Sequence, residues 1–539
     1  MNKFIIIFIF LMSIFFLSYI IYQNKLVNIP ERIDYSKVVE LYEDRDLGSI
    51  MHNQIKYHSF NFYNPLYNSL DNNQLEKINY FFESYGRNYL QYLPYFQTYE
   101  MENHLKDDGI TTFSLDPRFQ WVSGDVHTHN KWCIDDNFNY TIQEIMMMSN
   151  YSDLNVTSLL IWNKGLSIQQ EREMIDGKDS SISYSGKIIH YDAEISGVPS
   201  AAWGGHILLL NLENLNRFKD FTIYPKSTIL IIDFYKTQED VFVGFAHPQL
   251  FPQDNIFEKP YVHNFSKMSL VELPIQIARG KIDFIETEGE EYTEVINTGL
   301  NIWSRLENSG FKVPLAGSSD NPCVGRGVGF TKTYVLIEGN LTYEKFLESL
   351  KMGRSVITND RDEWLTFTVN NQTLGSEVNI SSGEKIFVDL HTSFKNTTQV
   401  LLDINGENTK YFYIEPGQRI TSIKGMPILN KSSWITFQTF HTIASPVYIN
   451  VDNKPIRALA DDACYLMRFT EIYIKLGEMN AIDFGEDREQ ILKAYHEAYS
   501  IFEQRFKESG GSYCKPLPGD PSVSSSSLNN ILEENHEKK

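Results

Sequence analysis

Short apolar runs alternate with segments of helical period between about residues 119 and 360. This alternation is typical of β/α units arranged around a mostly parallel sheet. Strands are expected at Phe119 to Val126, Val156 to Trp162, Ile188 to Ile195, His206 to Leu212, Val241 to Ala246, Lys281 to Thr287 and Val313 to Gly317. Helices are expected at Thr141 to Asn150 and Glu291 to Ser309, where apolar residues recur at three and four positions.

After Arg354 the apolar period changes from 3.6 to 2. Residues 361–455 are therefore expected to form a small antiparallel β-sandwich, in which Asn405-Gly406 marks a hairpin turn. Two helices, Asp461 to Leu476 and Glu486 to Glu508, should then close the fold as a C-terminal helical pair within residues 456–511. Residues 512–539 form a Ser, Glu and Lys tail that we expect to be disordered.

The first 25 residues indicate where the protein works. Phe4 to Tyr22 is a nearly continuous apolar run that follows Lys3, as in a signal peptide or a retained signal anchor with a transmembrane helix. The remainder is expected to be extracytoplasmic, either membrane-anchored through this segment or secreted. Residues 26–118 are rich in Tyr, Phe and Asn and are interpreted as an N-terminal accessory region. Several Asn-x-Ser/Thr sequons would permit glycosylation in a eukaryotic secretory pathway.

Composition excludes some classes of function. The 539-residue chain is 42% hydrophobic, which is enough for several packed cores, so it is not a disordered protein. Its formal net charge of −21 would repel phosphate backbones, so nucleic acid is not an expected partner. Four cysteines in so long a chain cannot build a disulfide framework, although one or two bridges remain possible.

Candidate metal ligands follow the predicted strands. His127 and His129 lie in a His-x-His motif, which projects two imidazoles from one face of a strand. Glu194, His247 and Asp320 each lie at or just after the end of another predicted strand. Because the carboxyl ends of parallel strands gather at one rim, these side chains should converge. The mixed nitrogen and oxygen set suits one or two Zn, Mn or Fe ions.

A family resemblance rests on the order of these motifs. The chain reads Gly124-Asp125-Val126-His127-Thr128-His129, then Glu194, then Ala246-His247-Pro248, then Gly317-Ser318-Ser319-Asp320, then Gly353-Arg354-Ser355. Over about residues 119–360 it resembles the CehA/McbA-like metallohydrolases of the PHP (polymerase and histidinol phosphatase) superfamily. The resemblance implies a distorted (β/α)7 PHP-type barrel that hydrolyses a phosphoester, carbamate or amide bond. In this interpretation Glu194 bridges two ions and Asp320 binds metal and orients the nucleophile.

The chain departs from the superfamily pattern at two motifs. Asn163 stands where the second motif usually ends in histidine, and Asp320-Asn321-Pro322 replaces Asp-x-His. Fewer ligands make a third ion doubtful, and Asp135 is either a compensating ligand or a turn residue. Asp125 is a further secondary candidate, because it can accept an imidazole N–H. His206 is either a residue of the site or a structural histidine, and Arg326 either binds a substrate anion or is a solvated loop arginine.

Two functions remain open at this point. The first is an exported metal-dependent hydrolase in which an activated water attacks a small-molecule, ester or amide substrate. The second is a PHP barrel with a vestigial metal site that serves as a non-catalytic extracellular binding or adhesion module. The two absent histidines keep the second function open.

Overall fold

The computed structural model describes residues 118–516, except for 131–139, 165–166, 169–173, 197–204, 215–225, 238–239, 247–271, 288–299, 324–326, 361, 418–422, 424–425 and 481–483. The predicted leader, almost all of the accessory region, most of the tail, and residues His247, Asp135 and Arg326 lie outside the described residues. The same is true of the Asn163 side chain. Among the described helices, none combines the length and apolar character needed to cross a membrane.

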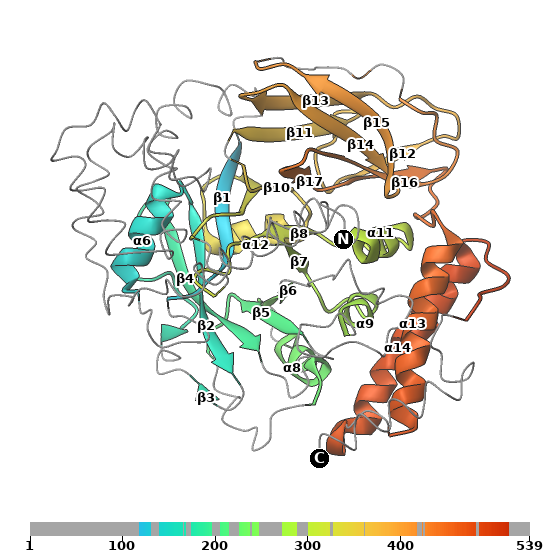
Figure 1. Cartoon of the computed structure of the whole chain (residues 1–539), viewed down its shortest axis with the longest axis horizontal. Helices are drawn as coiled ribbons and strands as arrows, with labels where there is room; N and C mark the ends of the chain where they lie inside the picture. The colour runs from blue at the N-terminus through green and yellow to red at the C-terminus, as the bar shows by residue number, and fades with distance from the viewer. Residues whose placement is uncertain are drawn as a thin grey trace, which may run out of the picture. The chain divides into compact units, whose positions relative to one another are not determined.

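A large mixed sheet organises the first part of the chain (Figure 1). Its strands here are β1 (Phe119–Thr128), β2 (Val156–Lys164), β3 (Ser167–Ile168), β4 (Ile188–Ser196), β5 (His206–Leu210), β6 (Phe242–Ala246), β7 (Phe284–Thr287), β8 (Leu315–Gly317), β9 (Lys332–Glu338) and β10 (Ser355–Thr358). The strand order runs β10-β9-β1-β2-β4-β5-β6-β7-β8. The pairing of the described strands does not close the sheet, because the strand order ends at β8 on one side and at β12 (Glu377–Ile380) on the other.

Seven of these strands were predicted as parts of a mostly parallel sheet. The prediction of strand direction is right for six of the seven and wrong for β5. Strands β1, β2 and β4 are parallel to one another, and so are β6, β7 and β8. β5 is antiparallel to both of its neighbours. Only residues 197–205 separate β4 from β5, so the connection is shorter than the dozen or more residues that a parallel crossover needs.

The described helices of the α/β part are α6 (Ile142–Tyr151), α8 (Thr228–Tyr235), α9 (Glu272–Ala278), α11 (Leu300–Asn308) and α12 (Tyr343–Lys351). Two of them were predicted: α6 lies within one residue of its expected bounds, and α11 lies within the expected range Glu291 to Ser309. Thr141 and Glu144 form a capping box at the start of α6, which satisfies backbone N–H groups there. On α12, Phe346 lies in the core with Val126 and Leu160 and packs over Gly124, where an added Cβ would collide with its ring.

The regular elements in the described part of residues 363–451 are all strands, as the change of period predicts. They are β11 (Glu363–Val369), β12 (Glu377–Ile380), β13 (Val388–Phe394), β14 (Thr398–Ile404), β15 (Glu407–Ile414), β16 (Ser433–Gln438), β17 (Thr442–Ala444) and β18 (Val447–Val451). Asn405 and Gly406 adopt positive φ in the β14–β15 hairpin, which confirms the predicted turn. β11 and β13 form a separate two-stranded sheet, whereas β17 pairs with β10 and so continues the large sheet. Buried residues of both sheets share one hydrophobic core.

Two long helices, α13 (Ala460–Glu478) and α14 (Arg488–Glu508), complete the described chain and confirm the predicted pair. They pack against each other, and α14 also contacts α8 and α9. A disulfide joins Cys464 to Cys514. The fold is therefore mixed α/β, with one large mixed sheet that extends from the metal-ligand motifs into the β-rich segment.

Candidate metal centre

The two histidines lie where the pairing of β1 is irregular. The pairing of β1 with β2 shifts between Asp125 and Thr128. Such a shift reverses the alternation of side chains, so residues before and after it point to different sides. His127 and His129 are both buried, and their Nε2 atoms lie 3.0 Å apart.

Both imidazole rings are oriented through their other nitrogen atom. Nδ1 of His129 donates to the carbonyl oxygen of Leu160 at 2.8 Å, and Nδ1 of His127 lies 2.8 Å from a carboxylate oxygen of Glu286. Because a carbonyl or carboxylate oxygen accepts, Nδ1 carries the hydrogen and each neutral ring turns an Nε2 lone pair inward. Two lone pairs that face each other at 3.0 Å repel unless a proton or a metal ion lies between them.

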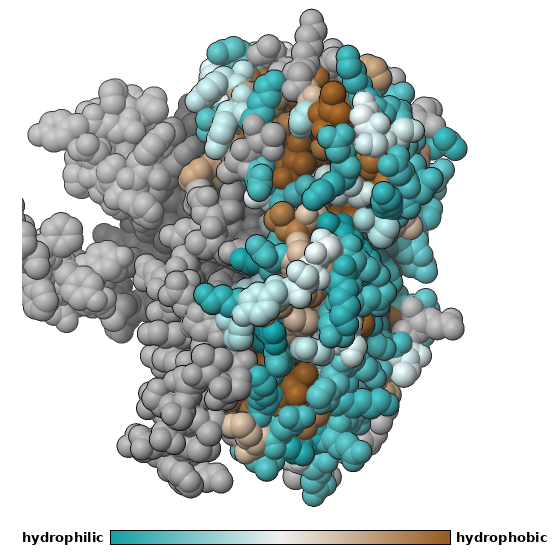
Figure 2. All heavy atoms as spheres, turned by 90° about the vertical axis from the view of Figure 1, so that its right-hand side faces the viewer, coloured by the Kyte–Doolittle hydropathy of each residue, from teal (hydrophilic) through white to brown (hydrophobic). Residues whose placement is uncertain are grey.

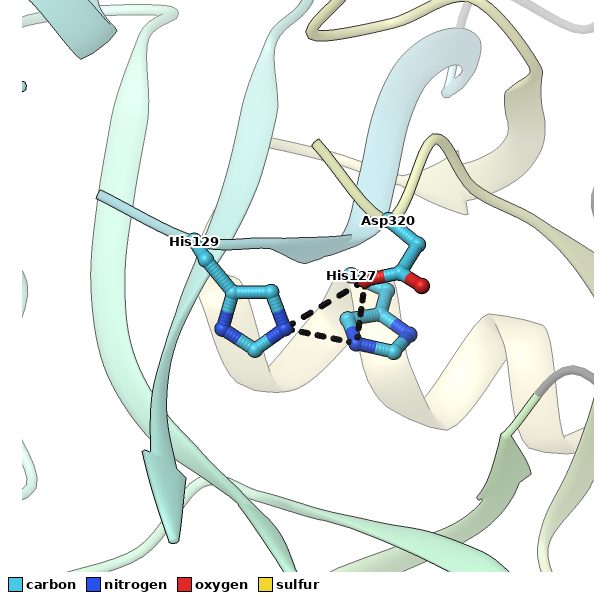
Figure 3. A group of neighbouring side chains, drawn as sticks. All are labelled: His127, His129 and Asp320. Atoms are coloured by element: carbon cyan, nitrogen blue, oxygen red, sulfur yellow. Dashed lines mark hydrogen bonds and ion pairs between the residues drawn. The ribbon is translucent and has the colours of Figure 1, made fainter. Parts of the chain in front are cut away.

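Asp320 reaches this point because its backbone is joined to β1. Asp320 N–H donates to the His127 carbonyl at 2.9 Å, and an isolated parallel bridge pairs Thr128 with Asn321. One Asp320 carboxylate oxygen lies 3.4 Å from the Nε2 atom of each histidine. His127, His129 and Asp320 therefore offer three buried ligand atoms within 4.8 Å of one another (Figure 3).

Glu194 supplies a further carboxylate from the end of β4. One of its oxygens lies 3.2 Å from Nε2 of His129 and 3.6 Å from Nε2 of His127. Its other oxygen lies 2.6 Å from Nδ1 of His206, the first residue of β5. The structure thus brings five of the predicted site residues together, and His206 belongs to the site through Glu194.

The spacing and the charge of this group both fit a divalent cation. Ligand atoms at about 2.0–2.2 Å from an ion, separated by roughly 90–110°, lie about 3.0–3.4 Å from one another. The two Nε2 atoms lie 3.0 Å apart, and each lies 3.2–3.6 Å from a carboxylate oxygen of Asp320 and of Glu194. Burying these carboxylates and Glu286 without compensating positive charge would be costly.

The pKa values report the same demand for positive charge. Burial alone would lower the pKa of His127, but the charges of Glu286, Asp320 and Glu194 raise it well above its usual value. Burial would raise the pKa of Glu194, but His206 and His127 hold it well below its usual range. Glu194 therefore remains ionised and attracts positive charge toward the inward-facing nitrogens.

The role predicted for Asp125 is wrong in one respect. Its carboxylate accepts the backbone N–H of His127 at 3.1 Å, not a ring N–H. It also accepts the Ser319 hydroxyl at 2.6 Å and the Gly329 N–H at 2.8 Å. Asp125 therefore joins β1 to the loop that carries Asp320.

Sequence reasoning missed Glu286, the carboxylate that orients His127. Glu286 lies near the end of β7, is almost fully buried and also accepts a hydrogen bond from the Ser318 hydroxyl. Its signal was present, because the rule that selected Glu194 as a carboxylate at a strand end applies equally to Glu286 in the predicted strand Lys281 to Thr287.

Comparison with models of protein families and with curated protein sequences gives no match. The class that the structure defines is a mixed α/β protein in which a buried His127/His129/Asp320 group could bind a metal ion.

Proposed function

We propose that this protein is a metal-dependent hydrolase with a distorted PHP-type barrel, related to the CehA/McbA-like group that its motifs resemble. The observation that carries the proposal is the convergence of the two Nε2 atoms with carboxylates of Asp320 and Glu194 at 3.0–3.6 Å. Six strands of common direction and the bridge between Thr128 and Asn321 support a barrel-like arrangement. The strands described between residues 363 and 451 support a sandwich in this part of the chain.

Zn, Mn or Fe is the proposed cofactor, with one or two ions. The mixed set of imidazole and carboxylate ligands favours these ions over Ca or Mg. His127, His129 and Asp320 would hold the first ion. Glu194 has one oxygen toward the histidine pair and the other toward His206, so it is the residue suited to bridge toward a second ion.

Hydrolysis assigns a task to each group. A bound divalent ion would supply Lewis acidity and lower the pKa of a coordinated water from about 15.7 to near 7. Asp320, only 4% exposed, is placed to orient the attacking water and to accept its proton. Glu286 and the Leu160 carbonyl keep both rings in the tautomer that leaves Nε2 available. The bond cleaved would be a phosphoester, carbamate or amide of a small molecule.

Metal content and turnover together test this function. The purified ectodomain should retain at least one equivalent of Zn, Mn or Fe after mild dialysis, measured by elemental analysis. Aryl phosphate, aryl carbamate and aryl ester substrates then report hydrolysis. The variants His127→Ala/His129→Ala and the isosteric Asp320→Asn should lose both metal and turnover.

The exposed His496, whose partner is Glu478, provides a matched control outside the site. His496→Ala should retain full metal content and activity. If the double histidine variant hydrolyses as fast as the parent protein, the hydrolase proposal fails. Metal well below one equivalent in the parent would instead support the non-catalytic extracellular binding or adhesion module. In either case we propose that the protein is exported and is held by, or cleaved from, its N-terminal apolar segment.

A further inference from the structure

A second pocket lies away from the candidate metal centre, among α11, the β12 and β18 strands and the end of α14. Its volume is about 340 Å³, within the range of small-molecule sites. Its lining includes Glu307, Lys312, Tyr448, Lys454, Arg457 and Arg505. The face of the molecule that carries α13 and α14 is largely hydrophilic, with hydrophobic side chains in separate patches (Figure 2).

Positive charge gathers around this pocket although the whole chain has a net charge of −21. Lys312 lies over the Tyr448 ring at 5.2 Å, and Arg505 lies over the Phe311 ring at 5.4 Å. These contacts hold the cations in place. Lys454 is exposed at the rim. A cationic ligand would be repelled by such a lining.

Carboxylates offset part of this charge but leave an excess. Lys312 pairs with Glu377, and Glu508 accepts from Nε of Arg457 at 2.6 Å and lies 3.5 Å from Arg505. Lys454 has no ion-pair partner among the described residues. The pocket therefore keeps a local positive potential toward a ligand.

Glu307 gives the pocket a buried polar group that is not satisfied. Its Oε1 atom accepts the Val313 N–H at 2.9 Å, whereas Oε2 is buried without a hydrogen-bond partner in the described chain. Burial raises the pKa of the Glu307 carboxyl well above its usual value. A neutral carboxyl carries a hydrogen that it can donate. A buried donor without a hydrogen bond is costly, and a ligand oxygen would accept this hydrogen bond.

We propose that this pocket binds a small molecule that carries an oxyanion, either a carboxylate or a phosphate. Lys454, Arg457 and Arg505 supply the positive charge that attracts the anion, and Glu307 donates a hydrogen bond to it from the buried side. Charge-assisted hydrogen bonds of this kind are stronger than those between neutral groups. The proposal does not depend on the hydrolase function, because none of these residues belongs to the candidate metal centre.

Isothermal titration of the full chain with inorganic phosphate and with benzoate tests this proposal. Bound metal is first removed with a strong chelator, which is then dialysed away, so that phosphate cannot report on the metal centre. Saturable binding of at least one probe is expected, and the two titrations distinguish a phosphate from a carboxylate ligand. The exposed side chain of Lys454 allows Lys454→Glu to be made without disturbing the core, and this change should weaken binding by about tenfold or more.

Lys493→Glu on α14 is the matched control, because it reverses one exposed charge outside the pocket lining. It should bind the probe as the parent does. Glu307→Gln keeps a donor N–H and should also retain binding. Absence of saturable binding for both probes, or equal binding by Lys454→Glu and the parent, would overturn the proposal. Markedly tighter binding by Glu307→Gln would contradict the donor role, since it would indicate a repelling carboxylate.

Discussion

Replacing Glu286 with Gln should weaken metal binding although Glu286 does not face the ligand cluster directly. Glu286 lies 2.8 Å from Nδ1 of His127, and both side chains are fully buried. Removing the carboxylate charge lowers the basicity of the ring and loosens its orientation. Partners of this kind contribute about 10–100-fold to metal affinity. That range corresponds to roughly 1.4–2.7 kcal/mol of binding free energy.

Competition with a chromophoric chelator measures this affinity for Zn or Mn. Ser318→Ala removes the second hydrogen bond to Glu286 and should produce a smaller loss in the same direction. Glu307→Gln provides a matched control, because it replaces another fully buried glutamate outside the site. Thermal unfolding of each variant without metal separates folding from binding. If Glu286→Gln binds metal as tightly as the Glu307→Gln control, the assigned role of Glu286 is wrong.

Three further predictions concern stability. Burial raises the pKa of Asp403 to about 7. Since the unfolded pKa is about 3.9, the folded state holds the proton more tightly, and the free energy of unfolding should fall by roughly 3 kcal/mol between pH 4 and 7. Urea unfolding of Asp403→Asn should lack this fall. Gly124→Ala should destabilise the fold by about 1–3 kcal/mol, because the added Cβ collides with Phe346. Adding Phe346→Leu to this variant should restore part of the lost stability, and no recovery would show that the collision is not the cause. Cys464→Ser opens a 50-residue loop to Cys514 and should cost about 4 kcal/mol, whereas an unchanged melting temperature would argue against a stabilising bridge.

The spacing of apolar residues predicts the helices and strands of this fold well, because burial of one face of each element determines that spacing directly. The predicted strands of the α/β part, the Asn405-Gly406 hairpin and the helices α13 and α14 all occur within a few residues of their expected bounds. Strand direction was less predictable, as β5 shows. A fully buried antiparallel strand and a parallel strand present the same apolar run, so only the length of the connection distinguishes them.

Convergence of the site followed from the strand-end rule, but the partners of its members did not. The sequence places Asp125 two residues before His127, and this proximity suggested a ring hydrogen bond. The pairing of β1 with β2 shifts between Asp125 and Thr128, and the His127 ring contacts Glu286, which is 159 residues away from His127 in the chain. A one-residue shift in register leaves no signal in a single sequence, because it depends on the pairing of β1 with β2.

The antiparallel direction of β5 explains why His206 reaches the site. The first residue of a parallel strand lies at the edge opposite to the ligand-bearing strand ends. Because β5 runs against β4, its first residue lies instead beside the end of β4, where His206 contacts Glu194 at 2.6 Å. The same reversal thus adds an imidazole to the rim that carries Glu194. If Glu194 bridges two ions, as we propose, His206 is the described residue best placed to bind the second.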